Sequence, residues 1–61
     1  MNLAERLALV QVKLDGVLMT DEAERPCFVQ GGDNVMRRWK EDTEIEEIVC
    51  YLEHKARSQG V

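Results

Sequence analysis

Two segments of the sequence each begin with a helix start signal and continue with apolar residues at alternating steps of 4 and 3. The apolar stripe of the first segment consists of Leu3, Leu7, Val10, Leu14 and Val17, and that of the second of Ile45, Val49, Leu52 and Ala56. Such spacing places the side chains along one face of a helix, and this face must be buried against another surface. The pattern therefore predicts two helices that pack through their stripes.

The length of the chain limits what these stripes can pack against. A chain of 61 residues forms one domain, residues 1–61, and buries about 60% of its unfolded surface if it folds alone. Chains of this size commonly gain stability from disulfides, a metal ion or self-association. Cys27 and Cys50 are the only cysteines and do not make a disulfide framework. Self-association is therefore the favoured route.

Residues 2–18 are predicted to form the first helix. Asn2 is a typical N-cap residue, and Glu5 follows at the capping-box position. Leu9 and Val12 lie away from the main stripe, so a second side of this helix is also apolar. A helix with two apolar sides is typical of burial between neighbours, which again favours an oligomer.

The same stretch also fits a β-hairpin. Apolar and polar residues alternate over residues 10–14, and Asp15-Gly16 is a favoured hairpin turn. Strands at 9–14 and 17–20 would follow from this interpretation. The N-cap signal and the longer run of heptad-like steps favour the helix, in which Gly16 weakens or ends the last turn.

Residues 20–33 are expected to connect the two helices. Pro26 disfavours helical geometry in the residue before it and ends any helix there. Residues 27–29 fit a short strand or an apolar plug over the helix pair, and Gly31-Gly32 predicts a turn.

A second helical region is predicted over residues 34–58, with Asp33 as its cap. Thr43 opens a second capping box, so a break is expected near 41–43. Acidic residues follow this break and basic residues end the region, which suits the helix dipole. Residues 44–58 carry the clearest helix signal of the chain.

We therefore expect an all-α fold, a helical hairpin of residues 2–18 and 34–58 that pairs with a second copy into a dimeric four-helix bundle. The oligomer interface would consist of Leu3, Leu7, Val10, Leu14, Val49 and Leu52. The alternative is a small α+β fold with a hairpin near 9–20 packed on the C-terminal helix.

The charge and the hydropathy pattern bear on partners and location. The formal net charge of −4 opposes nonspecific binding to nucleic acid and to anionic membranes. Apolar runs stay well short of the ~20 residues of a membrane span, and Glu5 and Arg6 interrupt the first of them. No signal-peptide pattern is present at the N-terminus, so we expect a cytoplasmic protein with reduced thiols.

Cys50 and His54 are separated by one helical turn and could supply two ligands to a zinc ion. Cys27 is the only other cysteine, and the paired motifs of zinc sites are missing. A solvated helix surface is therefore the favoured interpretation, and neither a metal nor a cofactor is expected. The same chain has little room for a substrate cleft and an oxyanion hole, so we expect no enzyme activity.

The only basic cluster spans residues 36–40, where three cations surround Trp39. Trp, Tyr and Arg dominate the energetics of protein interfaces. The predicted partner-binding residues are Arg37, Arg38, Trp39, Phe28 and Tyr51. We therefore expect a noncatalytic regulatory protein that binds and modulates or inhibits another protein. The alternative is a small DNA-binding regulator that uses residues 35–40.

Overall fold

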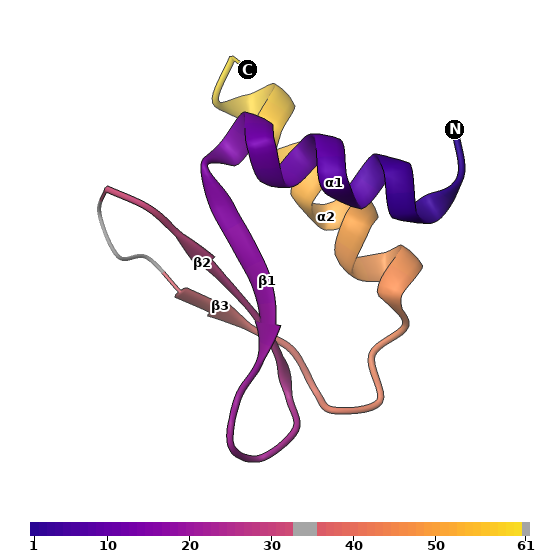
Figure 1. Cartoon of the computed structure of the whole chain (residues 1–61), viewed down its shortest axis with the longest axis vertical. Helices are drawn as coiled ribbons and strands as arrows, with labels where there is room; N and C mark the ends of the chain where they lie inside the picture. The colour runs from indigo at the N-terminus through magenta and orange to yellow at the C-terminus, as the bar shows by residue number, and fades with distance from the viewer. Residues whose placement is uncertain (33–35, 61) are drawn as a thin grey trace.

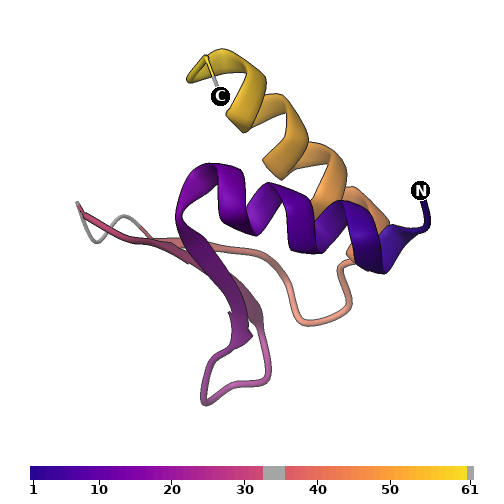
Figure 2. The ribbon, with the colours of Figure 1, turned by 45° about the horizontal axis from the view of Figure 1, so that its top comes forward.

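The computed structural model describes residues 1–32 and 36–60. Its elements follow the order α1 (Leu3–Leu14), β1 (Gly16–Thr20), β2 (Pro26–Gln30), β3 (Met36–Arg38) and α2 (Ile45–Ser58). The strands form one antiparallel sheet in the order β1-β2-β3. The two helices lie against each other, and the sheet extends away from them (Figures 1 and 2). The predicted all-α bundle is therefore wrong, and the chain has the small α+β fold of the alternative.

Helix α1 begins where the sequence predicts and ends earlier. The side-chain oxygen of Asn2 accepts a hydrogen bond of 2.9 Å from the backbone N–H of Glu5, which confirms the predicted N-cap. Asp15 takes the left-handed conformation, with φ 52° and ψ 52°, and its N–H caps the last turn. Since a left-handed residue cannot continue the helix, the chain turns into β1 at Gly16.

Strand β1 replaces the predicted last turn of the first helix. Val17 lies opposite Val29 and Leu18 lies opposite Phe28, so β1 gains a full hydrogen-bonded partner in β2. The alternative fold placed the turn of the hairpin at Asp15-Gly16, whereas the observed hairpin joins β1 to β2 through residues 21–25.

This loop is organised by Asp21. Its side-chain oxygen Oδ1 accepts hydrogen bonds of 2.9 Å from the backbone N–H groups of Ala23 and Arg25. The hydrogen bond from the Arg25 backbone is the main cause that lowers the pKa of Asp21. Glu24 takes a left-handed φ of 61° in the same loop. An Asx-type turn of this kind therefore reverses the chain without a glycine.

The predicted helix over 34–58 is wrong in its first half. Met36–Arg38 forms β3 instead, and the Trp39 N–H donates a bond of 3.0 Å to the carbonyl of Pro26. Pro26 has no N–H with which to donate the reciprocal hydrogen bond to the Trp39 carbonyl. The Nε of Arg25 donates to this carbonyl instead, at 3.2 Å. The predicted cap Asp33 lies outside the described residues.

The second half of that prediction is confirmed. Helix α2 covers Ile45–Ser58, close to the predicted 44–58, and it follows a loop at the predicted break. The N-cap residue is Glu44, whose side chain makes no capping hydrogen bond, rather than Thr43. Acidic residues in the first turn and basic residues in the last still complement the helix dipole.

The two apolar stripes meet inside one chain. The core cluster consists of Val10, Leu14, Phe28, Trp39, Ile48, Leu52 and Ala56. Of the six residues predicted to form an interface between chains, Val10, Leu14, Val49 and Leu52 are buried within the chain, and Leu3 and Leu7 are half-buried. The sheet supplies Phe28 as the surface against which the helices close. The stripes therefore do not need a second chain to be buried.

Candidate functional site

Within the part of the chain that the structure describes, one face of the sheet is left uncovered by the two helices. Strand alternation and register place Val17, Met19, Val29 and Met36 on this side, together with Cys27 and Arg38. We call these six residues the outer face. The side chains of Val17, Met19 and Met36 are 53%, 47% and 46% exposed. Cys27 is buried between its cross-strand neighbours Met19 and Arg38.

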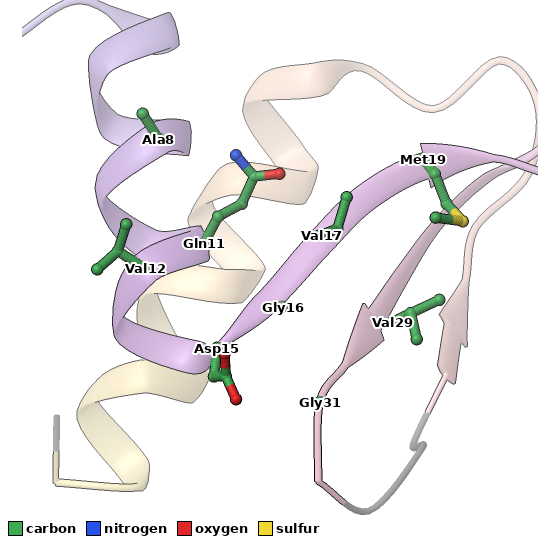
Figure 3. Close-up of a pocket in the computed structure, with 9 residues that line it drawn as sticks. All are labelled: Ala8, Gln11, Val12, Asp15, Gly16, Val17, Met19, Val29 and Gly31. Carbon is green, nitrogen blue, oxygen red and sulfur yellow. The ribbon is translucent and has the colours of Figure 1, made fainter.

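A groove runs between α1 and the outer face at β1. Its lining residues are Ala8, Gln11, Val12, Asp15, Gly16, Val17, Met19, Val29 and Gly31 (Figure 3). Val12 on the helix side is 79% exposed, although it is apolar. The groove therefore extends the apolar surface of the sheet onto the flank of α1.

A second surface lies on the opposite side of β3, where Arg37 contacts two aromatic rings. The Arg37 guanidinium carbon lies 5.5 Å from the Trp39 ring centroid and 5.2 Å from that of Tyr51. The two rings meet edge to face, with centroids 5.6 Å apart. We call Arg37, Trp39 and Tyr51 the aromatic–arginine cluster. Cation–π contacts of this kind attract a guanidinium to the ring faces by about 0.5–1 kcal/mol at exposed sites.

A basic depression adjoins this cluster. Its cations are Arg25, Arg37, Arg38 and Lys40, and its acidic side chains are Asp42, Glu44 and Glu47. Arg38 is paired with Asp21 at 3.2 Å, and the Arg25 Nε is bound to a backbone carbonyl. Among the described residues, no ion pair is formed by Arg37, so its charge is available to an incoming group.

The structure brings together three of the five residues predicted to bind a partner. Arg37, Trp39 and Tyr51 form the cluster, although Trp39 itself is only 8% exposed. Arg38 alternates to the outer face of β3 and also lines the basic depression beside the cluster, whereas Phe28 is 1% exposed within the core. Phe28 therefore presents no surface to a partner in this fold.

Sequence reasoning missed the outer face. Its signal was two short continuous apolar runs, residues 17–19 and 27–29, which fit strands with apolar side chains on both faces. The heptad-like steps that included Val17 obscured this signal, because Val17 satisfies both patterns.

The cysteines and the possible metal ligands lie apart. Cys27 is a buried free thiol in β2, and Cys50 is an exposed free thiol on α2. Within residues 1–32 and 36–60, no three side chains of His, Cys, Asp or Glu gather as a metal site would require. The described helices are also too short or too polar to cross a membrane.

Comparison of the chain with protein-family models, with curated proteins and with solved structures finds no match.

Proposed function

We propose that this chain is a noncatalytic protein-binding module that recognises an acidic segment of another protein and thereby modulates or inhibits it. The observation that supports this proposal is the position of Arg37, held against Trp39 and Tyr51 with no carboxylate partner among the described residues.

Ordering an arginine side chain on binding costs conformational free energy. A free arginine side chain loses up to ~2 kcal/mol of rotamer entropy when a contact immobilises it. Contact with two rings offsets part of this cost before a partner arrives. A guanidinium can also form a bidentate pair with a carboxylate. Arg, Trp and Tyr are also the residues that dominate binding energy at protein interfaces.

The acidic side chains of the depression favour a protein partner over nucleic acid. Asp42, Glu44 and Glu47 stand beside the four cations and would repel a continuous phosphate backbone. A short acidic peptide needs to place only one or two carboxylates at Arg37, whereas a nucleic acid presents a continuous row of phosphates. A cytoplasmic setting suits this proposal, because the exposed thiol of Cys50 stays reduced there.

The test compares immobilised wild-type chain with Arg37→Ala and with Arg57→Ala, a charge-matched control on the last turn of α2. A partner should be retained by the wild type and by the control. Its affinity for Arg37→Ala should fall about 30-fold, as expected for a hot-spot residue.

Two results would contradict the proposal. Equal retention by Arg37→Ala would remove the cluster as the binding surface. A shift of duplex DNA at low salt, lost in Arg37→Ala and kept in Arg57→Ala, would support the DNA-binding alternative instead.

A further inference from the structure

We infer that the free edge of β3 binds an extended segment of another protein as a further strand, and that this segment carries one acidic residue between two apolar residues. The inference rests on the proposed function, because the acidic residue is the one that pairs with Arg37. It adds that the partner is held through its backbone and states the side chains that it carries.

The register of the sheet places the backbone groups of Met36 and Arg38 on this edge. The Trp39 N–H donates to the Pro26 carbonyl, so the ladder bonds between β2 and β3 fall at Trp39 and, two residues earlier, at Arg37. The N–H and C=O groups of Met36 and Arg38 therefore point away from β2. Among the described residues, these groups have no hydrogen-bond partner. They are free to pair with an added strand.

The opposite edge of the sheet is less open to such pairing. On β1, the outermost strand on the other side, the backbone N–H of Leu18 is bound to the Gln11 side chain at 2.9 Å. An added strand would have to displace this bond. The β3 edge is therefore the one that accepts a strand without losing an existing hydrogen bond.

The side chains of β3 favour an acidic segment over a second copy of this chain. Arg37 and Arg38 occupy two of the three positions of the strand, and no carboxylate does. Two β3 strands paired antiparallel about Arg37 would place like charges directly opposite each other, which is destabilising. A carboxylate opposite Arg37 is instead attracted, since Arg37 forms no ion pair among the described residues.

The pairing geometry limits the segment to one acidic residue. Because the backbone groups of Arg37 face β2, a residue opposite Arg37 on an added antiparallel strand forms the close type of pair, with Cα atoms about 4.5 Å apart. Its side chain lies on the same face as that of Arg37, beside the basic depression. Asp42, Glu44 and Glu47 line the same depression and would repel further carboxylates.

The residues on either side of the acid would lie on the outer face, opposite Met36 and Arg38. Met36 is apolar and 46% exposed, and the charge of Arg38 is already paired with Asp21. Apolar side chains of the segment would continue the row of Val17, Val29 and Met36 across the sheet. Branched residues such as valine suit both the strand and this row.

The experiment titrates the isotope-labelled full chain with the capped peptide Thr-Val-Glu-Val-Thr and follows the backbone amides by NMR. Two N-methylated peptides are compared with it. In the first, both valines are methylated and cannot donate to the β3 edge. In the second, only the glutamate is methylated, and its N–H would point away from β3. The two modified peptides therefore separate backbone pairing from attraction between side chains.

A pair of variants tests the same edge from the side of the protein. Met36→Pro removes one N–H that points away from β2, and edge strands tolerate proline in this orientation. Met36→Ala is the matched control, because it shortens the side chain and keeps the N–H. Circular dichroism establishes that both variants are folded, and the peptide comparison stands without them.

We expect the amides of Met36 and Arg38 to shift and to gain protection from hydrogen exchange when the peptide binds. Methylation of the two valines should weaken binding about tenfold, as for two lost hydrogen bonds, and methylation of the glutamate less than about threefold. Met36→Pro should bind the peptide about fivefold more weakly than Met36→Ala.

The results distinguish failure of this inference from failure of the proposed function. Binding that is lost in Arg37→Ala but unchanged by methylation of the valines would overturn the inference and leave the proposed function standing. Binding that is unaffected by Arg37→Ala would contradict both. A wild type that does not bind the peptide at millimolar concentration would overturn the inference, as would concentration-dependent shifts of the Met36 and Arg38 amides without peptide, which would assign the edge to a second copy.

Discussion

The side-chain oxygen of Gln11 accepts a hydrogen bond of 2.9 Å from the backbone N–H of Leu18, and thereby joins helix α1 to the free edge of strand β1. The two residues are seven positions apart, across the sharp bend at Asp15. This bond satisfies an edge donor that would otherwise seek water or another strand. It also holds one wall of the groove against the sheet.

Gln11→Ala should destabilise the fold by about 0.5–1.5 kcal/mol, the net value of a typical hydrogen bond. The measurement is urea unfolding followed by the fluorescence of Trp39. Lys13→Ala, an exposed substitution on the same helix, is the control and should change the free energy of unfolding by less than about 0.5 kcal/mol. Equal effects of the two substitutions would show that the Gln11 bond contributes little.

Gly16→Ala should destabilise the fold by about 1–3 kcal/mol through overpacking. An added Cβ would overlap the ring of Phe28 and lie 2.8 Å from the carbonyl oxygen of Val29. Phe28 is fully buried, so a shift of its ring disturbs the packing of the core. The midpoint of urea unfolding measures the effect, and a midpoint equal to that of the wild type would disprove the close approach.

The neighbouring substitution Asp15→Gly should act in the opposite direction. Asp15 holds a left-handed conformation that costs a non-glycine residue about 1–2 kcal/mol, less for Asp than for most. Glycine should recover about 0.5–1 kcal/mol after its greater loss of chain entropy. A higher thermal midpoint is the expected result. A lower one would mean that the Asp15 carboxylate stabilises the bend.

The ion pair between α1 and α2 predicts a pH dependence. Arg6 contacts both carboxylate oxygens of Glu53, at 3.0 and 2.6 Å, and these hydrogen bonds lower the pKa of Glu53 below its ordinary value of 4.5. A carboxyl group with a lowered pKa stabilises the fold above that ordinary value, and the stabilisation is lost as the pH falls through the lowered pKa.

The stability advantage of the wild type over Glu53→Gln should therefore be full near neutral pH and vanish in acid. It should also shrink at high salt, because the pair is partly exposed. Urea midpoints at several pH values measure the difference. Glu41→Gln, a change on an exposed loop residue, should show no such trend. A constant difference down to acid pH would argue against the pair.

Leu52→Ala should cost about 2–5 kcal/mol, because it opens a cavity at a side chain with 0% exposure. A domain of this length has roughly 3–9 kcal/mol of stability in all, so the variant should be close to unfolding at room temperature. Leu9→Ala, at a 43% exposed position, should cost less than about 1 kcal/mol. Circular dichroism melting distinguishes the two, and equal losses would disprove the assigned core.

Local signals in the sequence were reliable where neighbours in the chain decide the structure. The Asn2 cap, the helix over Ile45–Ser58 and its charge pattern depend on contacts within a few residues, and the structure has all of them. The stripe residues Val10, Leu14, Val49 and Leu52 were correctly expected to be buried, because apolar residues at these steps must find a partner surface.

The stripes did not indicate which part of the chain would cover them. Residues 16–20 and 36–38 could continue a helix by their local pattern, and became strands because each found a partner in Pro26–Gln30. Pairing between distant segments contributes hydrogen bonds and side-chain contacts that outweigh weak local preference. For the same reason, the aromatic–arginine cluster was predicted as a set of residues but not as a geometry, and the outer face was not predicted.

The sequence by itself thus determined the start of the first helix, the C-terminal helix and the apolar positions that must be buried, because these follow from periodicity and capping. Only the tertiary structure decided that a three-stranded sheet, rather than a second chain, covers the helix stripes. It also decided that Arg37 meets Tyr51 across 14 positions of the chain. Both depend on contacts between distant segments, whose energies no local pattern records.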